Sequence, residues 1–177
     1  SQPSCVIYSL GSNGQMDFEK EIIEQTNNNC EVHTFDTQDW SKSFTGTGIH
    51  FHEVHIGGKD DPVKQTRALK TLMSDLGHDH IDVLKMDIEW SEYEVLWSLA
   101  TGGHPYIGQL QVEVHLSSRD FLANTGWWID RVEGLFKHLE KLGLRQFHRE
   151  TNSHDPHCHE FAFGSVNPRP EFHSKRK

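Results

Sequence analysis

The sequence predicts an α/β fold with a mostly parallel sheet, and three observations lead to this class. Segments with strand patterns alternate with segments of helical periodicity, an order that favours parallel strands joined by crossover helices. The segment Ile81–Ile88 is apolar at most positions, as expected for a strand covered on both faces. The chain opens with an apolar strand, a glycine turn and a helix, the order that begins a nucleotide-binding βαβ unit.

The amino-terminal half supplies three strands and two helices. The expected elements are, in order, a strand Cys5–Leu10, a helix Asp17–Gln25, a strand Cys30–Phe35, a strand Ile49–Ile56 and a helix Val63–Leu76. Apolar residues recur at helical spacing in the second helix, and Gly77 ends it. Residues 37–48 are rich in Ser, Thr and Gly and too few for a full helix. We therefore expect a shortened link between the second and third strands.

The carboxyl-terminal half continues the alternation and closes with an antiparallel pair. Its expected elements are a strand Ile81–Ile88, a helix Ser91–Leu99, a strand Leu110–Leu116, a helix Gly126–Leu142 and final strands Leu144–Arg149 and His159–Val166. Ser91 is a suitable N-cap, and Glu94 completes a capping-box pattern. A chain of 177 residues suits a single core, so we expect one domain over residues 1–167 and a flexible tail over residues 168–177.

Acidic residues follow two of the expected strands. Asp87 and Glu89 lie at the end of the strand that begins at Ile81, and Asp36 follows the second strand. Ligands of open α/β sheets bind outside the carboxyl ends of the strands, and a carboxylate after the second strand is suited to ribose hydroxyls. The alternative is that these are solvated acids at strand ends.

The glycine turn Gly11-Ser12-Asn13-Gly14 allows close approach of backbone to a ligand. No Lys-Ser or Lys-Thr pair follows the glycines, which argues against a phosphate-binding P-loop. Many βα turns contain glycine without binding a ligand, so the turn alone does not define a site.

The segments around these residues resemble a known family. Tyr8–Gly14 with Phe18-Glu19, followed by Thr34–Asp36, resembles the first two motifs of class I S-adenosylmethionine-dependent methyltransferases. Asp82–Glu89 with Glu92–Leu96 is similar to the signature of the FkbM-type group and its animal methyltransferase-like relatives. Two later blocks, Gln111–His115 and Cys158–Phe163, are also similar, so the resemblance extends over residues 5–167. It implies a Rossmann-like sheet of seven strands in the order 3-2-1-4-5-7-6.

The resemblance implies S-adenosyl-L-methionine as the cofactor. Expected cofactor-binding residues are Leu10, Gly11, Ser12, Asn13, Gly14, Phe18, Asp36, Thr37, Asp87 and Glu89. The chain departs from the family pattern in having two glycines in the turn, no acidic residue just before them, and Trp90 where the FkbM group usually has glycine.

Asp87, Glu113 and His115 are the expected catalytic residues. Residues 113 and 115 share one face of their strand. A histidine with a pKa near 6.5 is suited to accept a hydroxyl proton during methyl transfer. Two alternatives stay open: a divalent-cation site built from the carboxylates and the imidazole, and a structural role for His115. We favour the base and expect no metal.

The composition of the chain argues against two classes of partner, nucleic acids and the membrane interior. A formal charge of −9 argues against a nucleic-acid partner, and no apolar run is long enough to span a membrane. The abrupt start at Ser1 suggests trimming, so we assign no compartment.

Cys5 and Cys30 begin neighbouring strands and a bridge is conceivable, but we expect free thiols. Among the 14 histidines, His154–His159 has ligand types suited to zinc, although a polar loop is favoured, and we expect His50, His52 and His55 to form a solvated sheet edge.

The function indicated is S-adenosylmethionine-dependent O-methylation of a small-molecule or carbohydrate hydroxyl. The alternatives are a nucleoside-binding module without catalysis and a nicotinamide-dependent oxidoreductase, which would share the βαβ opening.

Overall fold

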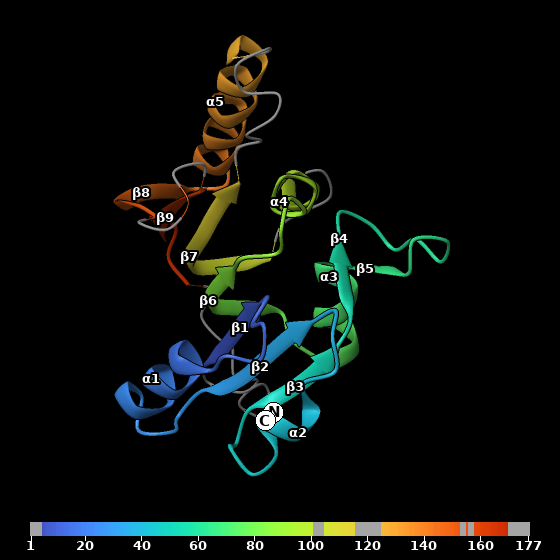
Figure 1. Cartoon of the computed structure of the whole chain (residues 1–177). Coiled ribbons are helices and arrows are strands. Elements are labelled where there is room, and N and C mark those ends of the chain that lie inside the picture. Colours follow the sequence, from blue (N-terminus) through green and yellow to red (C-terminus); the bar gives the residue numbers. More distant parts are fainter. Residues whose placement is uncertain (1–4, 101–104, 116–124, 153–154, 156–157, 170–177) are drawn as a thin grey trace, which may run out of the picture.

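The computed structural model describes residues 5–100, 105–115, 125–152, 155 and 158–169 (Figure 1). Seven strands form one sheet in the order β3-β2-β1-β6-β7-β9-β8. Five neighbouring strands of this sheet are parallel, namely β3, β2, β1, β6 and β7. In contrast, β9 is antiparallel to both β7 and β8. The expected α/β class and strand order are confirmed.

The bounds of the elements fix where each side chain lies. The main sheet contains β1 (Val6–Leu10), β2 (Glu31–Asp36), β3 (His50–Glu53), β6 (His80–Met86), β7 (Tyr106–His115), β8 (Leu144–Thr151) and β9 (Cys158–Ser165). Two short strands, β4 (His55–Gly57) and β5 (Thr66–Ala68), form a separate pair. The helices are α1 (Asp17–Gln25), α2 (Ser41–Phe44), α3 (Leu69–Leu76), α4 (Glu92–Ala100) and α5 (Thr125–Lys141).

The core lies on both faces of the sheet because alternate residues of each strand point to opposite sides. Tyr8 and Leu10 of β1 belong to a large apolar cluster that includes residues of α3, α4 and α5. Ile7 belongs to a smaller cluster with Phe44, against which residues of α1 pack. In Figure 1, α1 and α2 lie near β1–β3, while α5 lies toward β8 and β9. No helix among the described residues is long and apolar enough to span a bilayer.

Several element boundaries differ from the sequence prediction, and one of them is the start of β7, which lies at Tyr106 and not at Leu110. The helix expected from Val63 begins at Leu69, because the Asp61 carboxylate accepts hydrogen bonds from the backbone of Val63 and Lys64 and forms a turn there. Val63 is 92% exposed, so it does not belong to the apolar face of the helix. The expected strand Ile49–Ile56 is divided at Val54 into β3 and β4. The link after β2 contains only the four-residue α2, as the short link predicts.

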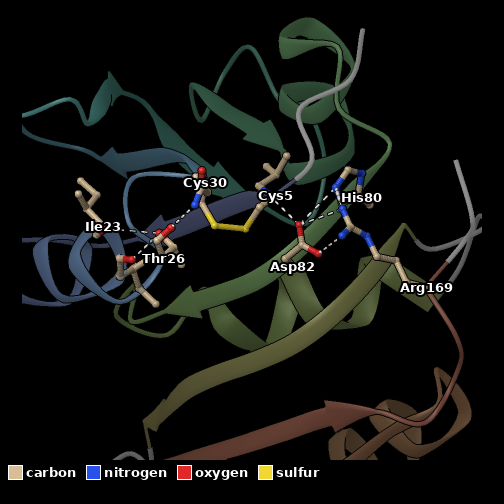
Figure 2. The surroundings of a disulfide bond; sticks show 10 residues. Cys5, Ile23, Thr26, Cys30, His80, Asp82 and Arg169 are labelled. Atoms are coloured by element: carbon tan, nitrogen blue, oxygen red, sulfur yellow. Dashed lines mark hydrogen bonds and ion pairs between the residues drawn. A yellow bond between two sulfur atoms is a disulfide. The ribbon is translucent and has the colours of Figure 1, made fainter.

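Cys5 and Cys30 form a disulfide, so the expectation of free thiols is wrong (Figure 2). Each cysteine directly precedes a strand, and Val6 pairs with Glu31 in the parallel register of β1 and β2. This register brings the two cysteine Cα atoms to 4.5 Å. Cys158 is a buried free cysteine.

Beside the disulfide, the end of the described chain contacts the sheet (Figure 2). Arg169 Nη1 lies 3.3 Å from Asp82 Oδ1, and its Nη2 lies 2.7 Å from His80 Nε2. Asp82 Oδ2 also accepts a hydrogen bond from the backbone of Val6. The part of the expected tail that is described therefore contacts β6, while residues 170–177 lie outside the described residues.

Candidate functional site

A cavity of about 650 Å³ lies at the carboxyl ends of β1, β2 and β6, where open α/β sheets bind ligands. The cavity is lined by eight of the ten expected cofactor-binding residues: Gly11, Ser12, Asn13, Phe18, Asp36, Thr37, Asp87 and Glu89. Leu10 is instead buried in the core, and Gly14 lies against Trp40, whose ring would be 2.7 Å from an added Cβ. Sequence reasoning did not assign Lys85, Glu19, Ile56 and Ile88, which also line the cavity.

The glycine turn fits between the ends of β2 and β6. Gly11 donates a backbone hydrogen bond to Phe35 at 2.9 Å, and Asp87 donates one to Leu10 at 2.9 Å. Gly11 has φ +80°, and an added Cβ would lie 1.7 Å from the carbonyl oxygen of Asp87. Lys85 Nζ donates to the Gly11 carbonyl at 3.0 Å. Only glycine fits at this crossing, so the turn and the acidic strand end form one rigid wall of the cavity.

Asp36 holds the glycine turn as well as lining the cavity. Its Oδ2 accepts hydrogen bonds from the backbone of Ser12 and Asn13 at 2.9 and 2.8 Å and from Ser12 Oγ at 3.0 Å. Its Oδ1 accepts one from the backbone of Gln38. Burial alone would raise the pKa of Asp36, but these hydrogen bonds outweigh it and lower the pKa. The carboxylate is therefore ionised at neutral pH.

The cavity lining is strongly acidic. Lys85 is its single lysine among the described residues, and the acids that line it are Asp17, Glu19, Asp36, Asp87 and Glu89. Such a lining favours a ligand that carries positive charge.

His115 lies at the end of β7 inside a group of four carboxylates. Its Nδ1 is 3.0 Å from Oε1 of Glu92, which is fully buried at the start of α4. Its Nε2 lies 3.4 Å from Glu89 Oε2, 3.9 Å from Glu113 Oε2 and 4.0 Å from Asp87 Oδ1. The structure thus brings the three expected catalytic residues together, with Glu92 as a partner that the sequence did not reveal.

The carboxylates determine the protonation of this group. Burial disfavours the charged imidazole, but the hydrogen bond to Glu92 and the charges of Glu92, Glu89 and Glu113 outweigh it and raise the pKa of His115 to about 9. Burial, opposed by Lys85 and reinforced by Glu113, raises the pKa of Asp87 to about 6. At neutral pH His115 is therefore protonated, and most Asp87 carboxyls are ionised.

The backbone before α4 has a left-handed conformation. Glu89 has φ +49° and Trp90 has φ +80°, a region that favours glycine. Trp90, at the position where the FkbM group usually has glycine, thus has a backbone conformation that favours glycine. The Trp90 ring centroid lies 5.6 Å from that of His115. The predicted capping box named Glu94, whereas it is Glu92 whose Oε1 accepts the backbone hydrogen bond of Ile88 at 2.9 Å.

A second cavity of about 340 Å³ lies beside the first. Lys85 and Asp87 line both cavities, and Glu113 lines the second. Gln109 and Gln111 of β7, with Phe147 and His148 of β8, form further parts of its wall. The end of β6 therefore separates an acidic cavity from a polar and aromatic one.

Two sets of side chains in this region have the ligand types of a metal site. Asp87, Glu92 and His115 each offer a donor atom, all within 4.8 Å of one another, and so do Glu113, His115 and Cys158. In the candidate zinc segment His154–His159, residues 154 and 157 lie outside the described residues.

Comparisons with known proteins agree with this fold. Residues 1–164 match the family described as "Methyltransferase domain". The human "Probable methyltransferase-like protein 24" is 34% identical over 161 residues, covering 81% of this chain and 42% of that protein. The chain therefore spans less than half the length of this curated relative.

Solved structures show the same fold at low identity. Methanococcus jannaschii fibrillarin, a pre-rRNA processing protein, superposes with a TM-score of 0.61 at 10% identity, over 93% of this chain and 67% of that one. The FkbM methyltransferase of Methylobacillus flagellatus KT has a TM-score of 0.55 at 15% identity, over 92% of this chain and 44% of that one.

The fold is that of a class I S-adenosylmethionine-dependent methyltransferase domain, whose cofactor is S-adenosyl-L-methionine. The chain belongs to the family of methyltransferase domains that includes methyltransferase-like protein 24.

Proposed function

We propose that this domain transfers a methyl group from S-adenosylmethionine to a hydroxyl of a small-molecule or carbohydrate acceptor. The observation that carries the proposal is the shared wall of the two cavities. Lys85 and Asp87 line both, so a donor in the larger cavity and an acceptor in the smaller one would meet at the end of β6. Holding two reactants in contact is the main requirement of methyl transfer.

The residues of the larger cavity fit the cofactor. When bound, S-adenosylmethionine supplies a methyl group on a positively charged sulfur, and it also carries an ammonium group. The acidic lining complements both charges. Gly11 lets the turn pack against the Asp87 backbone in the cavity wall, and Asp36 is the carboxylate suited to the ribose hydroxyls. In this proposal Asp87 and Glu89 lie at the methionine end.

The acceptor must lose its hydroxyl proton to a base on the chain. The sequence predicts His115 in this role, which requires its neutral form, whereas the surrounding carboxylates hold it protonated up to a pKa of about 9. Asp87, with a pKa of about 6, is ionised at neutral pH and lies on the shared wall. A pH–rate profile separates the two groups. A rate that rises through about pH 9 assigns the base to His115, and one that rises through about pH 6 and then levels assigns it to Asp87.

The acceptor class rests on the second cavity. Amide and carboxylate side chains beside an aromatic ring suit a polyhydroxylated ligand. The expectation that nucleic acid is not an acceptor has no support from the fold relatives, since one is a pre-rRNA processing protein. RNA therefore belongs in the test.

The test is methyl transfer by the 177-residue chain from isotopically labelled S-adenosylmethionine to a panel of sugars, small alcohols and an RNA oligonucleotide. We expect label on a sugar or alcohol, and a loss of roughly 10²–10⁴-fold in turnover in Asp87→Asn if that carboxylate is the base. Label on the RNA alone would contradict the acceptor class.

Binding without catalysis is the remaining alternative. Calorimetric binding of S-adenosylmethionine with no turnover on any acceptor of the panel would support it. The family assignment argues against a nicotinamide-dependent oxidoreductase, and titration with NAD would test that point directly.

A further inference from the structure

A second group of chemically capable side chains lies away from the cofactor cavity. We call it the distal histidine cluster and define it as Glu31, His33, His52, His78 and Tyr8. It lies toward the amino-terminal ends of β1 and β2, with Phe35 next to it on β2. Phe35 lines the cofactor cavity but no member of the cluster does, so the cluster adjoins the proposed methyl-transfer site without being part of it.

Three members of the cluster converge. His33 Nε2 is 2.9 Å from Glu31 Oε1, and His78 Nε2 is 3.6 Å from the same oxygen. One donor atom of each residue lies within 4.8 Å of the other two. Tetrahedral zinc with bonds of about 2.0–2.1 Å places its ligand atoms roughly 3.3–3.4 Å apart. The observed separations lie on either side of this value.

The other nitrogen of each imidazole is already held. His33 Nδ1 is 2.9 Å from His52 Nε2, and His78 Nδ1 is 2.8 Å from the Tyr8 hydroxyl. If both Nε2 atoms face a metal, each Nδ1 carries the hydrogen and donates it to its partner. Histidines that bind metal are oriented by such partners, which fix both the ring and its tautomer.

We propose that Glu31, His33 and His78 bind a divalent transition-metal ion, with zinc the ion that their ligand types suit best, and that His52 and Tyr8 orient the two imidazoles. Two histidines and one carboxylate leave a fourth position for water. The prediction that His52 belongs to a solvated sheet edge is corrected here, because its ring contacts His33 and Phe35.

Access to the site agrees with this assignment. The Glu31 side chain is 35% exposed, whereas those of His33 and His78 are 3% and 2% exposed. An ion can thus enter at Glu31 and be held by two buried rings.

The test uses the chain with its disulfide intact, treated with chelator and then freed of it. Calorimetry with Zn²⁺ should give a site of one ion per chain, and Co²⁺ should give the visible absorption of tetrahedral coordination. Glu31→Gln and His78→Gln should each lower the affinity by about 10-fold or more, and Tyr8→Phe, which removes only the orienting hydroxyl, should lower it by roughly 10- to 100-fold.

Matched variants exclude other sites. Glu24→Gln removes an exposed carboxylate of α1, and His115→Gln removes the imidazole that the other two candidate ligand groups share. Both should leave the Zn²⁺ affinity unchanged. If His78→Gln does not fold, Glu31→Gln keeps the test decisive, because that side chain is partly exposed. Failure to bind Zn²⁺, unchanged affinity in Glu31→Gln, or loss in His115→Gln would each overturn the proposal.

Discussion

Trp90 has a strained backbone conformation next to the proposed active site. Its φ of +80° lies in the region that costs a non-glycine residue roughly 1–2 kcal/mol. Its ring lies beside His115, so this chain has replaced the glycine usual in the FkbM group by a side chain that contacts the proposed active site. The strain is therefore located next to His115.

A pair of substitutions separates the backbone from the ring. Trp90→Gly and Trp90→Ala both remove the indole, but only glycine relieves the left-handed conformation. We expect the glycine variant to be more stable than the alanine variant by about 1 kcal/mol. Urea unfolding of both variants measures the difference, and equal free energies of unfolding would contradict the strain.

Gly11 and Gly46 allow a similar comparison. Both have positive φ, but an added Cβ meets the Asp87 carbonyl at Gly11 and no atom within 4 Å at Gly46. Gly46→Ala should cost about 1–2 kcal/mol, while Gly11→Ala should cost more and abolish binding of S-adenosylmethionine. Calorimetry and urea unfolding test both variants. Normal cofactor affinity in Gly11→Ala would show that the turn is not part of the site.

At the scale of elements, the disulfide joins the starts of β1 and β2. It closes a loop with a sequence separation of 25 residues. Chain-entropy arguments give such a bridge about 3.5 kcal/mol of stabilisation. Disulfides of this kind persist in oxidising compartments.

We therefore expect Cys5→Ser to lower the melting temperature by roughly 7–14 °C, the shift that about 3.5 kcal/mol produces in a domain of this size. Reductant should lower the melting temperature of the natural chain by a similar amount and leave Cys5→Ser unaffected. Cys158→Ser is the control for a buried thiol outside the bridge. A melting temperature that reductant does not change would contradict a stabilising bridge.

The elements also show which features the sequence could reveal. The glycine turn was predictable because it depends on a local pattern, Gly11 after an apolar strand, whereas the strand order came from the resemblance to class I methyltransferases. The disulfide was missed because it depends on the register of β1 against β2, which no single segment encodes. The start of α3 was missed because a side-chain turn at Asp61 ends the apolar pattern. Glu92 was missed because its partner, His115, belongs to another element.

For the whole molecule, the His115 group couples stability to pH. Its pKa is about 9 in the folded chain, well above the ordinary histidine value of 6.5, so the folded chain binds the proton more tightly than the unfolded chain does. The resulting stabilisation is complete below about pH 6.5 and is lost as the pH rises through about 9. His33, with a folded pKa of about 4, acts in the opposite direction but at lower pH.

We expect the free energy of unfolding to fall between pH 6.5 and 9, and His115→Gln to flatten this fall because glutamine keeps a donor for Glu92 without titrating. Urea unfolding at several pH values measures both curves. Identical slopes in the two proteins would exclude His115 as the source.

The position of β9 between β7 and β8 has a consequence for how the chain reaches its folded state. β9 is the last strand of the described sheet in sequence order, yet it pairs with neighbours on both sides. During synthesis, β7 leaves the ribosome with an open edge that no partner can occupy until residues 158–165 follow. A nascent chain stopped before this segment would present the free edge of β7 to other chains. Pairing with β9 therefore covers the edge of β7 and removes this risk of aggregation once residues 158–165 have been synthesised.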